Sequence, residues 1–140
     1  MINGNVSHWW QQIGAPDPRP QLPGDLHADV AVVGAGYTGL WTAYYLKLAK
    51  PELRVVVVEQ RHAGDGASGR NGGWLTNAIT GGREQYVETH GRDAAERFQL
   101  EMNRTVEEVI RVAQVEGIEA DVKRGGEFNV AYTPAQEARI

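Results

Sequence analysis

The sequence contains no cysteine, which excludes disulfide bonds, thiolate nucleophiles and cysteine-ligated metal sites. It has no apolar run that approaches the roughly 18 residues needed to span a bilayer. Its first residues carry no basic group followed by an apolar stretch, so they do not resemble a secretory signal. A net charge of −4 is opposite in sign to the basic surface that nucleic-acid partners favour. We therefore expect a cytoplasmic protein that binds neither a membrane nor a nucleic acid.

Histidines are few and scattered. The four of them, at positions 8, 27, 62 and 90, are too far apart in the sequence to indicate a metal-binding pair or a catalytic triad. We interpret His62 as a surface-loop residue and Asp65 as a turn former or a solvated acid. The sequence predicts no metal site, and it leaves the catalytic residues unknown.

The chain has 140 residues, and its 41% hydrophobic and 23% charged residues are typical of a globular domain. Residues 1–27 contain four prolines between positions 16 and 23, which favour an extended path over a helix. We call this stretch the N-terminal arm and expect Trp9 and Trp10 to pin it onto the domain; a role in covering a ligand is the alternative. Two further regions follow, residues 28–90 and residues 91–140.

Residues 28–59 have the pattern of a strand, a helix and a second strand. Ala28–Val33 is a short apolar run without alternation, as expected for a parallel strand buried on both faces. A helical period begins after Gly36 and ends before Pro51. Leu53–Glu59 is rich in valine and ends in an acid. The order predicts an α/β fold built on one Rossmann-like βαβ unit.

The turn between the first strand and the helix carries the spacing G-x-G-x-x-G, with glycines at positions 34, 36 and 39. In this context the pattern is typical of a dinucleotide site: Gly34 permits the turn, Gly36 lets the main chain approach a pyrophosphate, and Gly39 allows close helix–strand packing. Glu59 ends the second strand, where an acid accepts hydrogen bonds from a ribose and disfavours NADP. Alternatively, the glycines only form tight turns and Glu59 is a solvated strand end. The spacing alone does not separate NAD from FAD.

A second glycine-rich stretch, Gly64–Trp74, follows directly after the second strand, and we call it the glycine-rich segment. Because residues just after that strand lie near the ligand in a dinucleotide site, the segment is interpreted as a cradle. Ser68, Arg70 and Asn71 supply polar groups beside its bare main chain. The alternative is a loop that is mobile without ligand and only partly in contact with it.

The remaining sequence predicts a long helix over residues 93–116, ended by Gly117, with an apolar stripe and an exposed Glu107–Arg111 pair. The stripe consists of Phe98, Met102, Val106, Val109 and Ala113. Alternation over residues 127–132 predicts a further strand. Thr133 and Pro134 then have the pattern of a helix start that is too short to be stable alone. We therefore expect the chain to be a truncated part of a longer protein with an incomplete fold.

The stretches DVAVVGAGYTGLWTAYYL, VVVVE and GASGRNGG together resemble the N-terminal part of FAD-dependent oxidoreductases of the D-amino-acid-oxidase family, and within it the gamma-glutamylputrescine oxidoreductase-like branch. The likeness covers essentially the whole chain. It implies that the turn and helix start hold the FAD pyrophosphate, that Glu59 binds the adenosine ribose, and that residues 67–73 run toward the flavin ring. The implied cofactor-binding residues are Gly34, Gly36, Tyr37, Thr38, Gly39, Glu59, Ala67, Ser68, Gly69, Arg70, Asn71, Gly72 and Gly73.

The resemblance also implies an activity. Family members oxidise the C–N bond of a small amine or amino acid to an imine by hydride transfer to FAD, and oxygen is usually reduced to hydrogen peroxide. Residues 91–140 would lead into a substrate domain, and the predicted strand would begin its sheet. Two other hypotheses stay open: an NAD-dependent dehydrogenase built on the same βαβ unit, and a non-catalytic module or inactive fragment.

Overall fold

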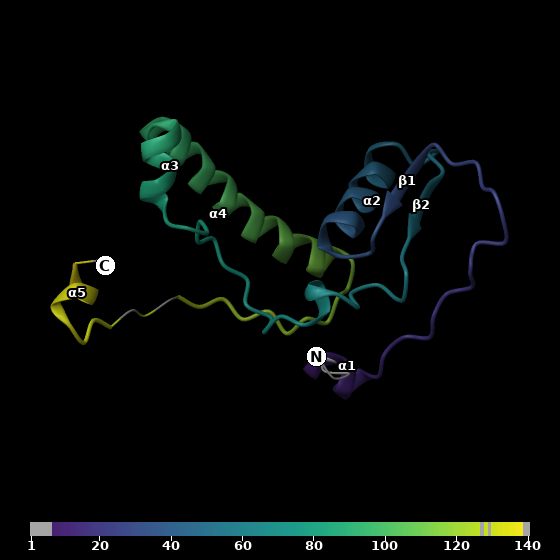
Figure 1. Ribbon diagram of the computed structural model, residues 1–140, viewed down its shortest axis with the longest axis horizontal. Coiled ribbons are helices and arrows are strands. Elements are labelled where there is room, and N and C mark those ends of the chain that lie inside the picture. The colour runs from purple at the N-terminus through teal and green to yellow at the C-terminus, as the bar shows by residue number, and fades with distance from the viewer. Residues whose placement is uncertain (1–6, 127, 129, 139–140) are drawn as a thin grey trace. The chain divides into compact units, whose positions relative to one another are not determined.

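The computed structural model describes residues 7–126, 128 and 130–138 and divides the chain into two compact units, Met1–Trp74 and Leu75–Ile140 (Figure 1). The first unit contains α1 (His8–Ile13), β1 (Val30–Val33), α2 (Tyr37–Ala49), β2 (Val55–Val58) and the short 3-10 helix η1 (Ala67–Gly69). The second unit contains α3 (Arg83–His90), α4 (Arg92–Val115) and α5 (Pro134–Glu137). None of the helices described is both long and apolar enough to cross a membrane.

The first unit is organised around a parallel pair of strands and the helix that connects them. β1 pairs with β2 from Val30 opposite Val55 to Val33 opposite Val58, and α2 packs against both strands (Figure 1). The ladder continues past β1, where the Gly34 N–H donates to the Val58 carbonyl at 2.8 Å. The predicted strand, helix and strand are therefore all present, as a two-stranded parallel sheet with its crossover helix.

The burial of the strands differs from the prediction. β1 was expected to be buried on both faces, but its residues alternate between half-buried and exposed, and Val33 is 88% exposed. All four residues of β2 are half-buried. A parallel sheet is buried on both faces when helices cover both of them. Here α2 is the helix that packs against the two strands, so the other side chains of β1 stay in contact with solvent.

The bounds of α2 follow from its sequence. Gly36 has extended dihedral angles and precedes the first helical residue, and Pro51 follows shortly after the last. Near the C-terminal end, the Lys47 ammonium donates to the carbonyls of Pro51 and Leu53, which is a common way to satisfy the chain where a helix ends. The small residues Gly39 and Ala43 are half-buried on the face toward the strands, which lets the helix approach the sheet closely.

The N-terminal arm contains one element that the sequence analysis did not predict. α1 spans His8–Ile13 because the prolines begin only at position 16, after Gly14 has ended the helix with a φ of 79°. The Ser7 hydroxyl caps it by accepting the Trp10 N–H at 3.3 Å. Residues 15–29 have no helix or strand, in agreement with the extended path predicted from the prolines.

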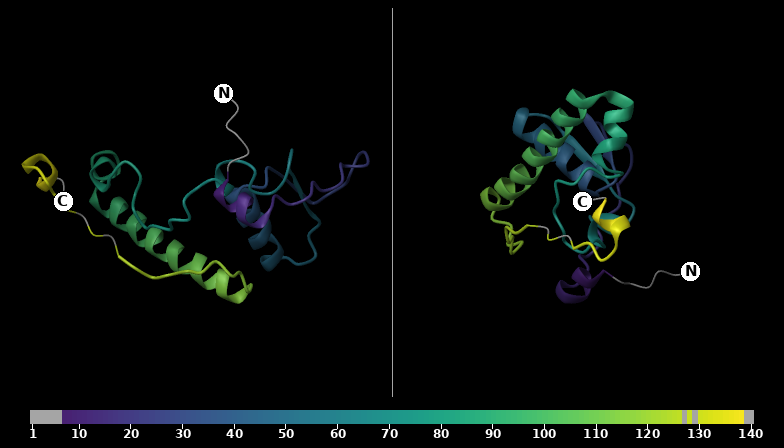
Figure 2. Two further views of the ribbon diagram at one scale, coloured as in Figure 1. Left: turned by 90° about the horizontal axis from the view of Figure 1, so that it is seen from below. Right: turned by 90° about the vertical axis from the view of Figure 1, so that its left-hand side faces the viewer.

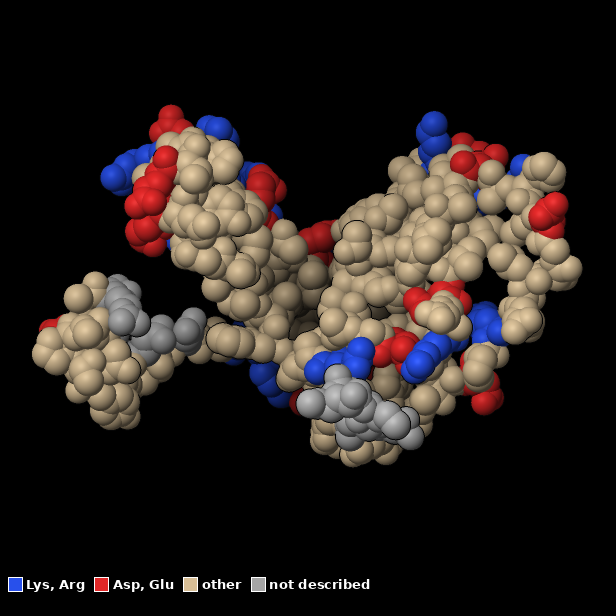
Figure 3. Space-filling view, viewed as in Figure 1, with Lys and Arg blue, Asp and Glu red and all other residues tan. Residues whose placement is uncertain are grey.

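The second unit consists mainly of α3 and α4, joined at Gly91, whose φ is 82°. α3 lies alongside the first half of α4 (Figure 2). The rings of Tyr86 and Phe98 pack between the two helices, with centroids 5.0 Å apart. Acidic and basic side chains are intermixed over these two helices on the face shown in Figure 3. α4 matches the predicted long helix to within a residue at each end and is followed, as predicted, by Gly117 with a φ of 63°.

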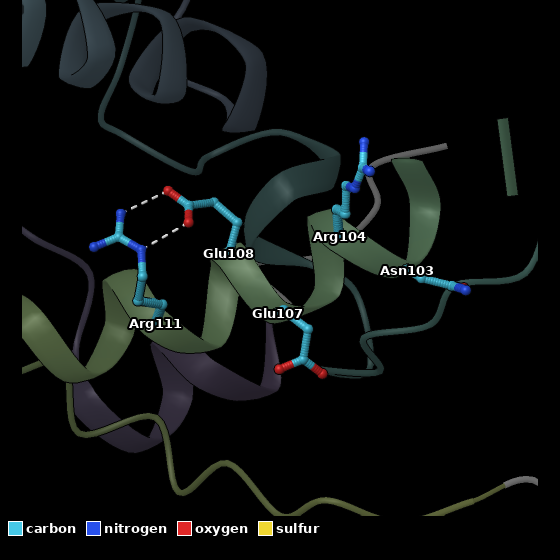
Figure 4. Close-up of a pocket in the computed structure, with 5 residues that line it drawn as sticks. All are labelled: Asn103, Arg104, Glu107, Glu108 and Arg111. Atoms are coloured by element: carbon cyan, nitrogen blue, oxygen red, sulfur yellow. Dashed lines mark hydrogen bonds and ion pairs between the residues drawn. The ribbon is translucent and has the colours of Figure 1, made fainter. Parts of the chain in front are cut away.

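Two details of α4 correct the sequence analysis. Its buried residues are Ala95, Ile110, Val112 and Ala113, of which only the last belongs to the predicted stripe; the remaining stripe residues are partly exposed. The predicted Glu107–Arg111 pair is not formed. Arg111 instead donates two hydrogen bonds to Glu108, at 2.7 and 2.6 Å (Figure 4). Glu107 binds Arg124 from the chain that follows the helix. Helix spacing alone could not foresee a partner 17 residues away.

The strand predicted over residues 127–132 is not observed. Glu127 and Asn129 lie outside the described residues, and the other members of this stretch adopt no strand conformation. An alternating sequence forms a strand only where a neighbouring strand satisfies its backbone groups. The predicted cap beyond it is confirmed: Thr133 precedes the one-turn α5, and its hydroxyl accepts the Gln136 N–H at 3.3 Å.

Candidate cofactor-binding site

The turn between β1 and α2 needs glycine at two positions for different reasons. Gly34 has a φ of 96°, in the left-handed region that side chains rarely adopt. Gly39 has no room for a side chain, since a Cβ atom there would lie 2.0 Å from the Gly34 carbonyl oxygen and 3.2 Å from Cγ1 of Val32. The predicted tight turn and the predicted close helix–strand packing are both present in the structure.

The N-terminal end of α2 presents backbone donors to its surroundings. The Tyr37 N–H donates to the Ser68 hydroxyl at 3.0 Å, and the Leu40 N–H is satisfied within the helix by Gly36. Among the residues that the structure describes, no acceptor binds the N–H groups of Gly36, Thr38 or Gly39. Free N–H groups at a helix N-terminus, with the helix dipole behind them, favour an anionic group such as a phosphate.

Glu59 lies immediately after β2, and its carboxylate binds the same turn. Oε2 accepts the Ala35 N–H at 2.9 Å, and Oε1 accepts the Arg61 N–H at 3.2 Å. These backbone N–H groups, that of Ala35 foremost, lower the pKa of Glu59 below its ordinary value by stabilising the charged form. The carboxylate is thus ionised at neutral pH. Each of its oxygens keeps a further lone pair that can accept another hydrogen bond.

The glycine-rich segment lies directly against this turn. The Gly64 N–H donates to the Ala35 carbonyl at 3.0 Å, and Asn71 Nδ2 donates to the Tyr37 hydroxyl at 2.9 Å. The Ser68 hydroxyl adds a third contact by accepting the N–H of Tyr37, the first residue of α2. The segment is therefore bound to the turn and the start of α2 at its beginning, middle and end. The structure therefore brings the two groups of predicted site residues together within the first unit.

Within the segment, polar side chains mostly stabilise the backbone of the segment itself. Arg70 Nε donates to the Gly66 carbonyl at 3.1 Å, and Asn71 both donates to the Ser68 carbonyl and accepts the Gly73 N–H, each at 2.8 Å. Ala67, Gly72 and Gly73 are exposed, with no polar side-chain group of their own, while Gly69 is half-buried. Contact of residues 67–73 with a cofactor stays a prediction.

Sequence reasoning did not foresee how α1 binds the segment. The Ser7 hydroxyl donates to the Gly69 carbonyl, and Trp9 Nε1 donates to the Asn71 carbonyl at 2.8 Å. From Trp9 and Trp10 we predicted that the N-terminal arm packs against the domain, but the sequence did not indicate which part of the domain it contacts. The docking surface is the segment itself.

His62 also differs from its prediction. We interpreted it as a surface-loop residue, but its side chain is only 15% exposed, because the Trp10 ring packs edge-on against it with centroids 5.1 Å apart. Its Nε2 lies 3.3 Å from an oxygen of Asp65. No group of three or more metal-ligating side chains is found in the described part of the chain.

A shallow hollow on the surface of α4, in the second unit, shares no residue with this site. Its walls are charged or polar side chains that mostly bind one another or the adjacent chain (Figure 4). They are Asn103, Arg104, Glu107, Glu108 and Arg111. A solvated row of ion pairs explains this surface without a ligand.

Comparison with known proteins supports the cofactor class. Residues 29–140 match the family described as FAD dependent oxidoreductase. The chain is 38% identical over 126 residues to gamma-glutamylputrescine oxidoreductase of Escherichia coli strain K12, an alignment that covers 88% of this chain and 28% of that protein. It is 36% identical over 106 residues to the probable oxidoreductase OrdL of Haemophilus influenzae, covering 76% of this chain and 24% of that protein.

A shorter alignment, 42% identical over 69 residues, relates the chain to sarcosine oxidase subunit beta of Rhizobium meliloti and covers 49% of this chain and 14% of that protein. The chain thus spans about a quarter of the length of the two relatives that it matches over most of its own length. No solved structure matches the chain significantly.

Proposed function

The chain belongs to the FAD-dependent oxidoreductase family, and we propose that it forms the FAD-binding part of an enzyme that oxidises the C–N bond of a small amine or amino acid. The observation that carries the proposal is that the backbone N–H groups of Gly36, Thr38 and Gly39 have no acceptor among the described residues and lie next to a glycine-rich segment bound to the same turn. The family is FAD-dependent, and two of the relatives are named gamma-glutamylputrescine oxidoreductase and sarcosine oxidase subunit beta.

The residues of the turn would bind the diphosphate of FAD. The three free N–H groups and the positive end of α2 compensate its negative charge. Ser68 already accepts the Tyr37 N–H, so its own hydroxyl hydrogen remains free to donate to a phosphate oxygen. Gly36 has no side chain that would keep the main chain away from the ligand.

Glu59 would bind the adenosine ribose. It is ionised, and its Ala35 contact fixes the carboxylate at the end of β2. An acid in this place accepts hydrogen bonds from ribose hydroxyls and repels a 2′-phosphate. Residues 67–73 would continue from the diphosphate toward the flavin ring.

When bound, FAD supplies the acceptor for the hydride that leaves the substrate carbon as its C–N bond becomes an imine, and we propose oxygen as the final electron acceptor, giving hydrogen peroxide. The contribution of this chain to that reaction is to bind and orient the cofactor. We assign no catalytic residue within it.

The test uses the complete gene product expressed with FAD. The purified protein should show a flavin absorption spectrum that is bleached when a small amine or amino acid is added without oxygen. A protein that stays colourless after reconstitution would contradict the proposal. A titration with NADH in parallel addresses the dehydrogenase alternative, because NADH binding without retained flavin would support that alternative instead.

A further inference from the structure

α1 contacts the glycine-rich segment at several points along its length. Ser7 and Trp9 bind the carbonyls of Gly69 and Asn71. The ring of Trp10 lies against the main chain of Gly69 and of Gly64, so that a Cβ atom on either would meet it at 3.1 and 3.3 Å. A six-residue helix therefore reaches from the first residue of the segment to beyond its middle.

The ring of Trp9 extends this contact to the other end of the segment. A Cβ atom on Gly73 would lie 3.1 Å from Cζ2 of Trp9. The rings of α1 thus use the missing side chains of three glycines as contact surface. At Gly69 the Gly64 carbonyl oxygen would also obstruct a Cβ atom, at 2.1 Å, so glycine is needed there for the turn of the segment as well as for α1.

A segment with five glycines in eleven residues needs such restraint. Glycine loses more conformational freedom on folding than any other residue, so a glycine-rich backbone holds one shape only where other contacts fix it. The internal hydrogen bonds of the segment are short-range, for example from the Arg70 N–H to the Ala67 carbonyl. Contacts from outside the segment come from Arg61 and His62, which bind Asp65, from the turn before α2 and the start of α2, and from α1.

We propose that α1 is a clamp that holds the glycine-rich segment in its cofactor-binding shape, and that Trp9 and Trp10 are positioning residues for FAD. The inference rests on the proposed function for its ligand but not for the contacts themselves. Apart from the contacts of Asp65, the segment is thus held by two sets of contacts, one from α1 and one from the turn and start of α2. The affinity for FAD should therefore depend on a helix that precedes the βαβ unit in the sequence.

The two tryptophans act by different atoms, and this difference gives a matched test. Trp9 Nε1 donates a hydrogen bond to the Asn71 carbonyl. Trp10 Nε1 is buried, and in the part of the chain that the structure describes it finds no acceptor. Replacing tryptophan by phenylalanine keeps a benzene ring but removes the N–H and the rest of the bicyclic ring. Trp9→Phe loses the Asn71 hydrogen bond as well as ring contact, whereas Trp10→Phe loses only ring contact with Gly64 and Gly69. Trp9→Phe should therefore loosen the segment more than Trp10→Phe does.

The first experiment measures amide hydrogen exchange in the complete gene product without FAD. In Trp9→Phe, the amides of residues 64–73 should exchange about fivefold faster, and in Trp10→Ala about tenfold faster, while those of α2 stay unchanged. Trp10→Phe should fall between the wild type and Trp9→Phe, because it loses ring contact but no hydrogen bond. The control on the same helix is Ile13→Ala, since Ile13 is 75% exposed. Faster exchange throughout β1 and α2 as well would mean a general structural role and would overturn the proposal.

The second experiment titrates the same apoproteins with FAD. The dissociation constant should rise in the same order, about fivefold for Trp9→Phe and about tenfold for Trp10→Ala, with a smaller rise for Trp10→Phe, and stay unchanged for Ile13→Ala. Equal affinity and equal exchange in all four variants would overturn the clamp. If the wild type binds no FAD, the proposed function fails, and the exchange order still decides whether α1 holds the segment.

Discussion

Gly39→Ala tests the geometry on which the whole site depends. The added Cβ would lie 2.0 Å from the Gly34 carbonyl oxygen, whereas ordinary contact begins at 3.4 Å. α2 would therefore have to withdraw from the turn by about 1.4 Å, because a backbone oxygen cannot rotate away as a side chain can. The same withdrawal separates the free N–H groups of the α2 N-terminus from the glycine-rich segment.

The expected magnitude follows from two opposing terms. Overpacking against a fixed backbone costs about 3 kcal/mol, the upper part of the usual range. Alanine recovers about 1 kcal/mol over glycine in a helix. The free energy of unfolding should thus fall by about 2 kcal/mol. Urea denaturation of the apoprotein, followed by circular dichroism, measures this change.

Two other glycines provide the comparison. Gly66→Ala places its Cβ in open space at an ordinary φ, so it should change the free energy of unfolding by less than about 0.5 kcal/mol. In Gly36→Ala the Cβ meets the Ser68 hydroxyl at 3.0 Å, and that side chain can turn aside only by giving up its hydrogen bond with the Tyr37 N–H. Gly36→Ala should therefore weaken FAD binding and cost about 1 kcal/mol of stability, less than Gly39→Ala. Should Gly39→Ala prove as stable as Gly66→Ala, the close approach of α2 to the turn would be refuted.

Three further variants test single contacts of the site. Ser68→Ala removes the acceptor of the Tyr37 N–H and should cost about 1 kcal/mol of stability and raise the FAD dissociation constant about tenfold; unchanged binding would exclude Ser68 from the site. Asn71→Ala should cost about 1 kcal/mol and speed exchange at the end of the glycine-rich segment; unaltered exchange there would contradict its bracing role. The pKa of Glu59 is lowered in the folded protein, so its contribution to stability is complete above its ordinary value of 4.5 and is lost as the pH falls through the folded-state pKa. Glu59→Gln should therefore flatten the acid side of the stability–pH curve, and a curve identical to that of the wild type would show that the Ala35 contact is not formed.

The sequence predicts the βαβ unit well because its signals are local. A valine-rich run, a helical period and a proline stop each depend on residues within a few positions of one another, and the observed elements follow them. The long α4 and its glycine end were predicted for the same reason. By contrast, the strand predicted over residues 127–132 depended on a partner strand, which no local pattern supplies.

In the candidate site, too, some features follow from the local sequence and others depend on the tertiary structure. The spacing of Gly34 and Gly39 by itself determined a tight turn and a close helix, because a missing Cβ is a property of the residue alone. Which atoms meet across the chain was decided only by the tertiary structure: Ser68 at the N-terminal end of α2, Glu59 on the Ala35 amide, and α1 on the glycine-rich segment. The physical reason is that hydrogen bonds and ring contacts form between groups adjacent in space, and their separation along the chain, up to 62 residues here, leaves no trace in the local sequence.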